Sequence, residues 1–186
     1  MDTALELHPG NFYLILAPRR LGRQMMNTFA ARLALNGSLR VVDAGNWFDA
    51  HSIARQVRLQ TTQLKQALNR ISVARAFTCY QVLSLLEGLS NSPEPTLMMS
   101  LLSTFADENV PELERGRLME EVIGNLHRLS QHAPVVASVA PESAEIFGQP
   151  HHISPLPTAL LEMLEDAADQ VLRYTYPDGY VQARLF

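Results

Sequence analysis

Short apolar runs of strand length alternate with segments of helical periodicity along most of this chain. Five such runs occur at residues 12–16, 40–43, 71–74, 96–102 and 134–139. A run of four to eight apolar residues is typical of a strand that is buried on both faces, and strands that alternate with helices form parallel sheets. The sequence therefore predicts an α/β fold with three layers (α/β/α) around a mainly parallel central sheet.

The segments between these runs carry apolar residues at the spacing of amphipathic helices. In residues 23–35, for example, Met26, Phe29 and Leu33 fall on one helical face, and Asn36-Gly37 is a helix stop signal. Helices are predicted at residues 23–35, 51–56, 62–68, 80–89, 112–132 and 160–167.

The pattern changes near the end of the sequence. Residues 170–174 and 180–185 are strand-like and flank Pro177-Asp178-Gly179. Because Asp-Gly is a strong signal for a tight hairpin turn, we expect a C-terminal antiparallel hairpin at one edge of the parallel sheet.

Composition places limits on the class of protein. The length of 186 residues favours a single domain spanning residues 1–186. The net charge is −4 and no run is rich in Lys or Arg, so the basic patch that nonspecific nucleic-acid binding needs is missing. The single cysteine, Cys79, excludes an internal disulfide and is interpreted as a small core residue.

No signal peptide and no membrane-length apolar run is apparent, so we expect a cytoplasmic location and no membrane contact.

The first apolar run leads into residues 17–24 (APRRLGRQ), in the context of a P-loop, G-x-x-x-x-G-K-[ST]. In that motif, backbone N–H groups and a lysine hold the phosphates, and a Ser or Thr hydroxyl binds Mg²⁺. Gly22 keeps one defining position. Ala17 replaces the first glycine, Arg23 the lysine and Gln24 the hydroxyl residue. The residues of this degenerate nucleotide-binding loop are Ala17, Arg19, Arg20, Gly22, Arg23 and Gln24, and a plain strand–loop–helix junction is the alternative interpretation.

Further segments resemble the ATPase core of RecA/RadA-type recombinases. Residues 41–49 (VVDAGNWFD), followed by Ile53-Ala54, are similar to the family's I-D-T-E-G-T-F-R-P segment and its I-A pair. Residues 71–77 (ISVARAF) are similar to its N-I-x-Y-A-R-A-F/Y segment, and residues 102–105 and 126–129 to the exit of its fourth strand and the long helix that follows. The resemblance covers residues 11–186 and implies a RecA-like core.

Residue by residue, this resemblance implies that the family's ATP chemistry is missing. The catalytic glutamate falls on Gly45, the Mg²⁺-associated aspartate on Ser100, and the glutamine that senses the γ-phosphate near Ala140. Asp43 keeps a family carboxylate, although a structural role for it, bound to nearby N–H groups, fits equally well. Phosphoryl transfer depends on lysine, metal and carboxylates. We therefore expect no ATPase activity, no catalytic residue and no cofactor.

The DNA-binding elements of the family are also changed. Its two DNA-binding loops correspond to residues 107–114 (DENVPELE) and 141–149 (PESAEIFGQ), and neither contains Arg or Lys. Charge repulsion argues against DNA binding through these loops, while binding through another surface stays open. The first predicted strand begins near residue 11, so we expect no N-terminal DNA-binding domain.

Together, these features predict a catalytically inactive RecA/RadA-like protein that acts by protein–protein interaction in DNA recombination, DNA repair or their regulation. The expected partner is an active recombinase or a second copy of the chain. Two alternatives stay open. The first is a divergent ATP-binding protein that uses Arg19, Arg20 and Arg23 for phosphates, and the second is a nucleic-acid-binding accessory factor. Adjacent loop histidines, His151-His152, are interpreted as solvated, and no metal site is expected.

Overall fold

The computed structural model describes residues 6–141 and 157–175, which form a single α/β domain on a six-stranded sheet. Every strand pair in these residues is parallel, and the strand order is β3-β2-β4-β5-β1-β6. The strands are β1 (Phe12–Leu16), β2 (Leu39–Asp43), β3 (Ile71–Arg75), β4 (Thr96–Met99), β5 (Val135–Val139) and β6 (Gln170–Arg173). The predicted α/β fold with a parallel central sheet is confirmed.

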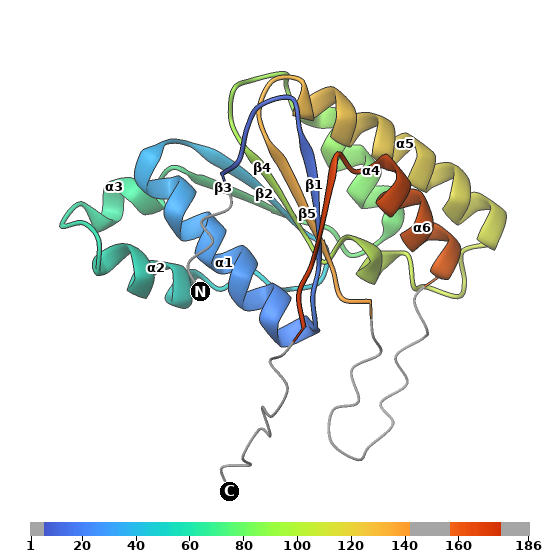
Figure 1. The fold of residues 1–186 in the computed structure, drawn as a ribbon, viewed down its shortest axis with the longest axis horizontal. Coiled ribbons are helices and arrows are strands. Elements are labelled where there is room, and N and C mark those ends of the chain that lie inside the picture. The colour runs from blue at the N-terminus through green and yellow to red at the C-terminus, as the bar shows by residue number, and fades with distance from the viewer. Residues whose placement is uncertain (1–5, 142–156, 176–186) are drawn as a thin grey trace, which may run out of the picture.

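Helices cover both faces of this sheet (Figure 1). One face carries α1 (Arg19–Asn36), α2 (Ala50–Arg58) and α3 (Leu64–Leu68), and the other carries α4 (Cys79–Gly88), α5 (Glu112–Ser130) and α6 (Thr158–Ala167). The chain moves in one direction across the sheet from β1 to β3 and in the opposite direction from β3 to β6. Right-handed crossovers place the helices of these two halves on opposite faces.

The core is divided by the sheet into two layers. Alternate side chains of β1 serve each layer: Phe12 and Leu14 pack with α4, α5 and α6, whereas Tyr13 and Ile15 pack with α1 and its neighbours. All five residues of β1 are buried. A strand covered on both faces needs apolar residues at every position, which is why the sequence shows a continuous run rather than an alternating one.

The first helix begins four residues earlier than predicted. The sequence pattern suggested a start at Arg23, but α1 begins at Arg19, so that Ala17 and Pro18 alone separate it from β1. A proline at the start of a helix is favourable because its fixed φ and missing N–H cost nothing there. The predicted nucleotide-binding loop is therefore mostly helix.

The fourth strand is shorter than the predicted segment 96–102. β4 stops at Met99 because Ser100 adopts a left-handed backbone conformation, with φ 55° and ψ 50°, and a 3₁₀ helix, η1 (Leu101–Thr104), follows. Leu101 and Leu102 are buried in the core, so their apolar character reflects burial and not strand structure. All other predicted elements up to residue 174 lie within two residues of the observed ones.

The prediction for the C-terminal hairpin is wrong for its first arm. Residues 170–173 do form a strand, β6, but it pairs in parallel with β1, with Tyr13 opposite Gln170. α6 carries the chain across one face of the sheet before β6, and such a crossover returns the chain in the same direction. The turn at 177–179 and the second arm at 180–185 lie outside the described residues.

Candidate functional site

A pocket of about 290 Å³ opens at the carboxyl edge of the sheet. Residues at or just after the ends of four different strands line it: Arg19 after β1, residues 43–46 at the end of β2, residues 75–77 at the end of β3, and Ser103 and Thr104 after β4. The chain leaves β2 towards α2 on one face and leaves β3 towards α4 on the other. Ligands of open α/β sheets bind outside the carboxyl ends of the strands, where neighbouring connections diverge in this way. This pocket is therefore the candidate site.

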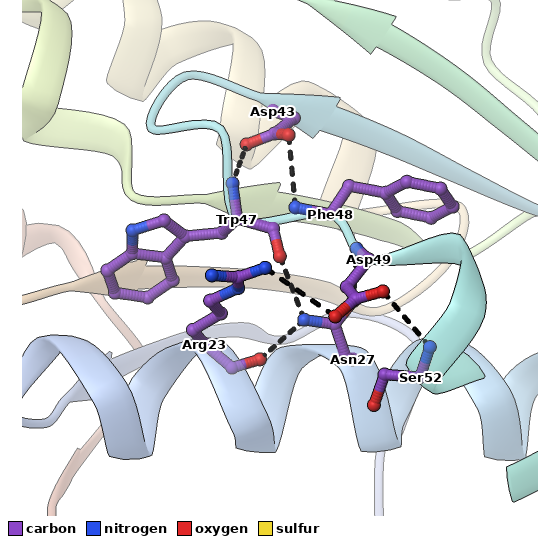
Figure 2. Close-up of polar contacts among 7 residues, drawn as sticks. All are labelled: Arg23, Asn27, Asp43, Trp47, Phe48, Asp49 and Ser52. Atoms are coloured by element: carbon purple, nitrogen blue, oxygen red, sulfur yellow. Dashed lines mark hydrogen bonds and ion pairs between the residues drawn. The ribbon is translucent and has the colours of Figure 1, made fainter. Parts of the chain in front are cut away.

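The Asp43 carboxylate lies at the base of this site and is already fully engaged. Its Oδ1 accepts hydrogen bonds from the backbone N–H groups of Trp47 at 2.9 Å and Gly45 at 3.4 Å, and its Oδ2 accepts one from Phe48 at 3.1 Å. Figure 2 shows the bonds to Trp47 and Phe48. The Nε of Arg75 lies 3.7 Å from Oδ2. These four groups match the four acceptor positions of a carboxylate, so Asp43 organises the loop after β2.

The same loop is fastened to α1 by Asn27 (Figure 2). The Asn27 side chain donates to the carbonyl oxygen of Trp47 at 2.9 Å and accepts from the N–H of Asp49 at 2.8 Å. Asp49 in turn accepts from the N–H of Ser52 at 3.0 Å, which caps α2, and lies 3.5 Å from Arg23. The hydrogen bond from Ser52, helped by the charge of Arg23, lowers the pKa of Asp49. The loop therefore has a fixed shape set by both neighbouring elements.

Gly45 and Ser100 pack directly against each other. A Cβ on Gly45 would lie 2.3 Å from the Cβ of Ser100 and 2.5 Å from its Oγ. Ser100 is itself held in place, because its N–H donates to the Oγ of Ser138 at 3.0 Å and its Oγ lies 2.5 Å from that of Ser103. The two positions that the resemblance assigned to the catalytic glutamate and the Mg²⁺-associated aspartate thus form one tight contact. No side chain fits at residue 45 in this arrangement.

The indole ring of Trp47 covers the beginning of α1. A Cβ on Gly22 would lie 2.9 Å from Cζ3 of Trp47, and the Trp47 side chain is buried. Gly22 is therefore needed for the close approach of the ring, in a helical conformation that other residues could adopt. An aromatic side chain fills the space above the first turns of this helix.

The predicted loop residues have different surroundings. Arg19 lines the pocket, while Arg20 and Gln24 are exposed on α1. Ala17 is buried and extends the sheet by donating its N–H to the carbonyl oxygen of Val139 at 3.2 Å. Of the nine predicted site residues, Arg19, Asp43 and Gly45 meet at the pocket, and Ser100 lies behind Gly45.

Neither the comparison with models of known protein families nor the comparison with curated proteins gave a match. The resemblance to RecA/RadA-type cores thus rests on the sequence motifs, and no family is assigned.

Among the described residues, no three His, Cys, Asp or Glu side chains gather where they could hold a metal ion. Helices in that part of the chain do not combine the length and the apolar character needed to cross a membrane.

Seven of the ten pocket residues were not recognised as site residues from the sequence, among them Arg75, Phe77 and Ser103. The sequence did contain a signal for Arg75 and Phe77. They come within three residues of the end of the predicted strand 71–74, and the carboxyl ends of parallel strands share one edge. Ser103 was assigned no role because the turn at Ser100 that positions it was not predictable. Asn27 gave no signal either, because its role depends on contacts with a loop twenty residues away.

Proposed function

We propose that this protein is a non-hydrolysing relative of the RecA/RadA-type core that works by binding an acidic protein partner at the carboxyl edge of its sheet. The observation that carries the proposal is the chemistry of this edge. Arg19 and Arg75 line the pocket beside Phe77, whose side chain is 76% exposed, and the buried carboxylate of the site is engaged by its own loop. Arginine and aromatic residues are the types most enriched at protein interfaces.

The start of α1 adds to the positive character of this edge. Pro18 occupies the N-cap without a capping side chain, and the first turn contains no acidic residue. Unpaired N–H groups and the helix dipole favour a carboxylate at such a position. Arg19 and Arg20 are both exposed there and have no ion-pair partner within residues 6–141 and 157–175. A partner carboxylate can therefore form bidentate contacts with arginine at this point.

The former catalytic positions support binding rather than hydrolysis. Gly45 is closed off by Ser100, and the space above Gly22 is filled by Trp47. With Gly45 and Ser100 in place of acidic residues, the protein keeps a carboxyl edge that can bind a partner but lacks the groups that orient water or neutralise phosphate. The resemblance suggests a partner from DNA recombination or repair, and an active recombinase is the first candidate.

Charge reversal at the start of α1 tests this proposal. We expect Arg19→Glu/Arg20→Glu to weaken the binding of a fluorescent deca-glutamate peptide by about tenfold, or about 1.4 kcal/mol, at low salt. Fluorescence anisotropy measures the affinity. Binding by the unchanged protein should also weaken as salt is added, because exposed charges are screened.

The matched control is Arg55→Glu/Arg58→Glu, which changes the net charge equally but alters the exposed last turn of α2. We expect this control to bind within about twofold of the unchanged protein, since two exposed charges remote from the contact contribute little. Equal loss in both variants would show a response to net charge alone and would refute the docking site.

A second candidate function, nucleotide binding, is favoured by the size of the pocket. Its volume of about 290 Å³ is close to that of small-molecule sites, and two arginines line it. A rise in melting temperature with Mg·ATP that Arg19→Ala abolishes would support this candidate over the first.

A further inference from the structure

Within the part of the chain that the structure describes, the β3 edge of the sheet has no paired neighbour. β3 pairs with β2 on one side, and none of the described residues pairs with its other side. The carbonyl oxygen of Arg70 accepts from Leu39, and the N–H of Ala76 donates to Asp43. Alternate residues of a parallel strand bond to the same neighbour, so residues 70, 72, 74 and 76 face β2. The peptide groups of residues 71, 73 and 75 therefore point away from the sheet.

Both faces of this edge strand are accessible. Val73 is 40% exposed, whereas its neighbour Val41 on β2 is buried. Ser72, which points to the opposite face, is also exposed. Neither helical layer thus covers the centre of β3 at residues 72 and 73, and a further strand has room to approach.

The strand also lacks the usual protection against pairing. Natural edge strands carry lysine, proline, a bulge or inward-pointing charges that prevent another strand from adding. The sequence of β3 is ISVAR, and its one charged residue, Arg75, sits at the end beside Asp43 of its own chain. The centre of the strand is uncharged.

We propose that β3 pairs in antiparallel fashion with β3 of a second copy, about a two-fold axis that passes beside Val73. In this register Val73 faces Val73 of the second copy, and Ile71 faces its Arg75. The three outward residues of each strand then form the hydrogen-bonded pairs of an antiparallel ladder, each exchanging two N–H···O bonds. The result is one continuous sheet through both copies.

A second copy fits this edge because the edge is complementary to itself. The outward peptide groups at 71, 73 and 75 are symmetric about Val73, so the same strand supplies every donor and acceptor that it needs. Apolar Val73 meets apolar Val73, on the face where Ile71 already packs. The two Arg75 side chains lie at opposite ends of the paired strands, so no like charges face each other.

Disulfide trapping tests the register. Val73→Cys should form a covalent dimer under mild oxidation, because Cα atoms of a hydrogen-bonded antiparallel pair lie about 5.5 Å apart, within disulfide range. The native thiol does not interfere: Cys79 is fully buried, and burial raises the pKa of its thiol. The matched control is Ser72→Cys. Ser72 is also exposed but faces Ala74 of the second copy, which leaves the two copies of residue 72 about 7–8 Å apart. We expect at least fivefold less dimer from this control on a non-reducing gel.

A charge exchange tests the same contact without a covalent bond. Val73→Lys and Val73→Glu each place like charges opposite one another, so each variant alone should sediment as a 20.8 kDa monomer. An equal mixture of the two should sediment at twice that mass, as should the unchanged protein. A monomeric unchanged protein, unaltered dimers of both variants, or equal trapping at residues 72 and 73 would overturn the proposal. Arg19→Glu/Arg20→Glu should leave the dimer intact, so failure here is separable from failure of the proposed function.

Discussion

Replacing Asp43 by alanine should lower the free energy of unfolding by about 4 kcal/mol. The carboxylate accepts from the buried N–H of Trp47 at 2.9 Å and from the part-buried N–H of Phe48 at 3.1 Å, with a longer contact to Gly45. Removal leaves these donors without an acceptor, and each unsatisfied buried group costs about 1–3 kcal/mol. For a domain of this length the loss corresponds to a fall in melting temperature of roughly 10 °C. Urea unfolding followed by circular dichroism measures it.

Two further variants test whether the loss of stability in Asp43→Ala comes from these hydrogen bonds. Asp43→Asn keeps one carbonyl oxygen, so its stability should lie between those of the unchanged protein and Asp43→Ala. Asp107→Ala is a control at an exposed aspartate, which bonds to Asn109 nearby in the chain, and should leave the unfolding midpoint almost unchanged. If Asp43→Ala is as stable as this control, then Asp43 does not organise the loop and the description of the site is wrong.

Replacing Gly45 by alanine should cost about 3 kcal/mol, because the added methyl group would lie 2.3 Å from the Cβ of Ser100. Overpacking typically costs about 1–3 kcal/mol, and Ser100 cannot move easily since Ser138 and Ser103 hold it. Gly45→Glu, which introduces the residue type that the resemblance to RecA/RadA-type cores assigns to this position, should be at least as destabilising. We expect no gain of ATP hydrolysis from it.

A change at Ser100, the partner of Gly45 in this contact, is the control for the Gly45→Ala variant. Ser100→Gly removes the clashing side chain and suits the left-handed conformation at φ 55°. The double variant Gly45→Ala/Ser100→Gly should therefore be more stable than the sum of the two single effects predicts, by about 1–2 kcal/mol. Additive effects in urea unfolding would contradict direct packing between the two residues.

The strands and most helices of the fold could be predicted because their signals are local. β1 and β5 are continuous apolar runs buried on both faces, and α5 shows the spacing of one apolar stripe. The start of α1 was misplaced for a local reason as well. Pro18 is a helix start signal, but the glycine at 22 suggested a phosphate loop, and the burial of Gly22 under Trp47 explains that glycine in another way.

The details that depend on tertiary contacts could not be predicted. A serine in the left-handed conformation has no sequence signature, and Ser100 is stabilised there by Ser138, on a different strand. The parallel pairing of β6 with β1 is likewise decided by a crossover and not by the residues of β6. For the site, the sequence indicated the positions of Arg19, Asp43 and Gly45. It left open whether Asp43 is a remnant of an ATP site or bonds to nearby N–H groups, and the structure shows three such bonds.

Phosphate release from millimolar Mg·ATP, followed with a coupled assay at high protein concentration, tests directly whether the protein lacks ATPase activity. We expect the same rate with the protein as without it, and the same rate for the Arg19→Ala and Arg23→Ala variants. Gly45 leaves no room for a side chain that orients water, and Asp43 has no free oxygen. Release above the protein-free control that both arginine variants abolish would refute the proposal of a non-hydrolysing protein, since the site would then be an active nucleotide-hydrolysing centre.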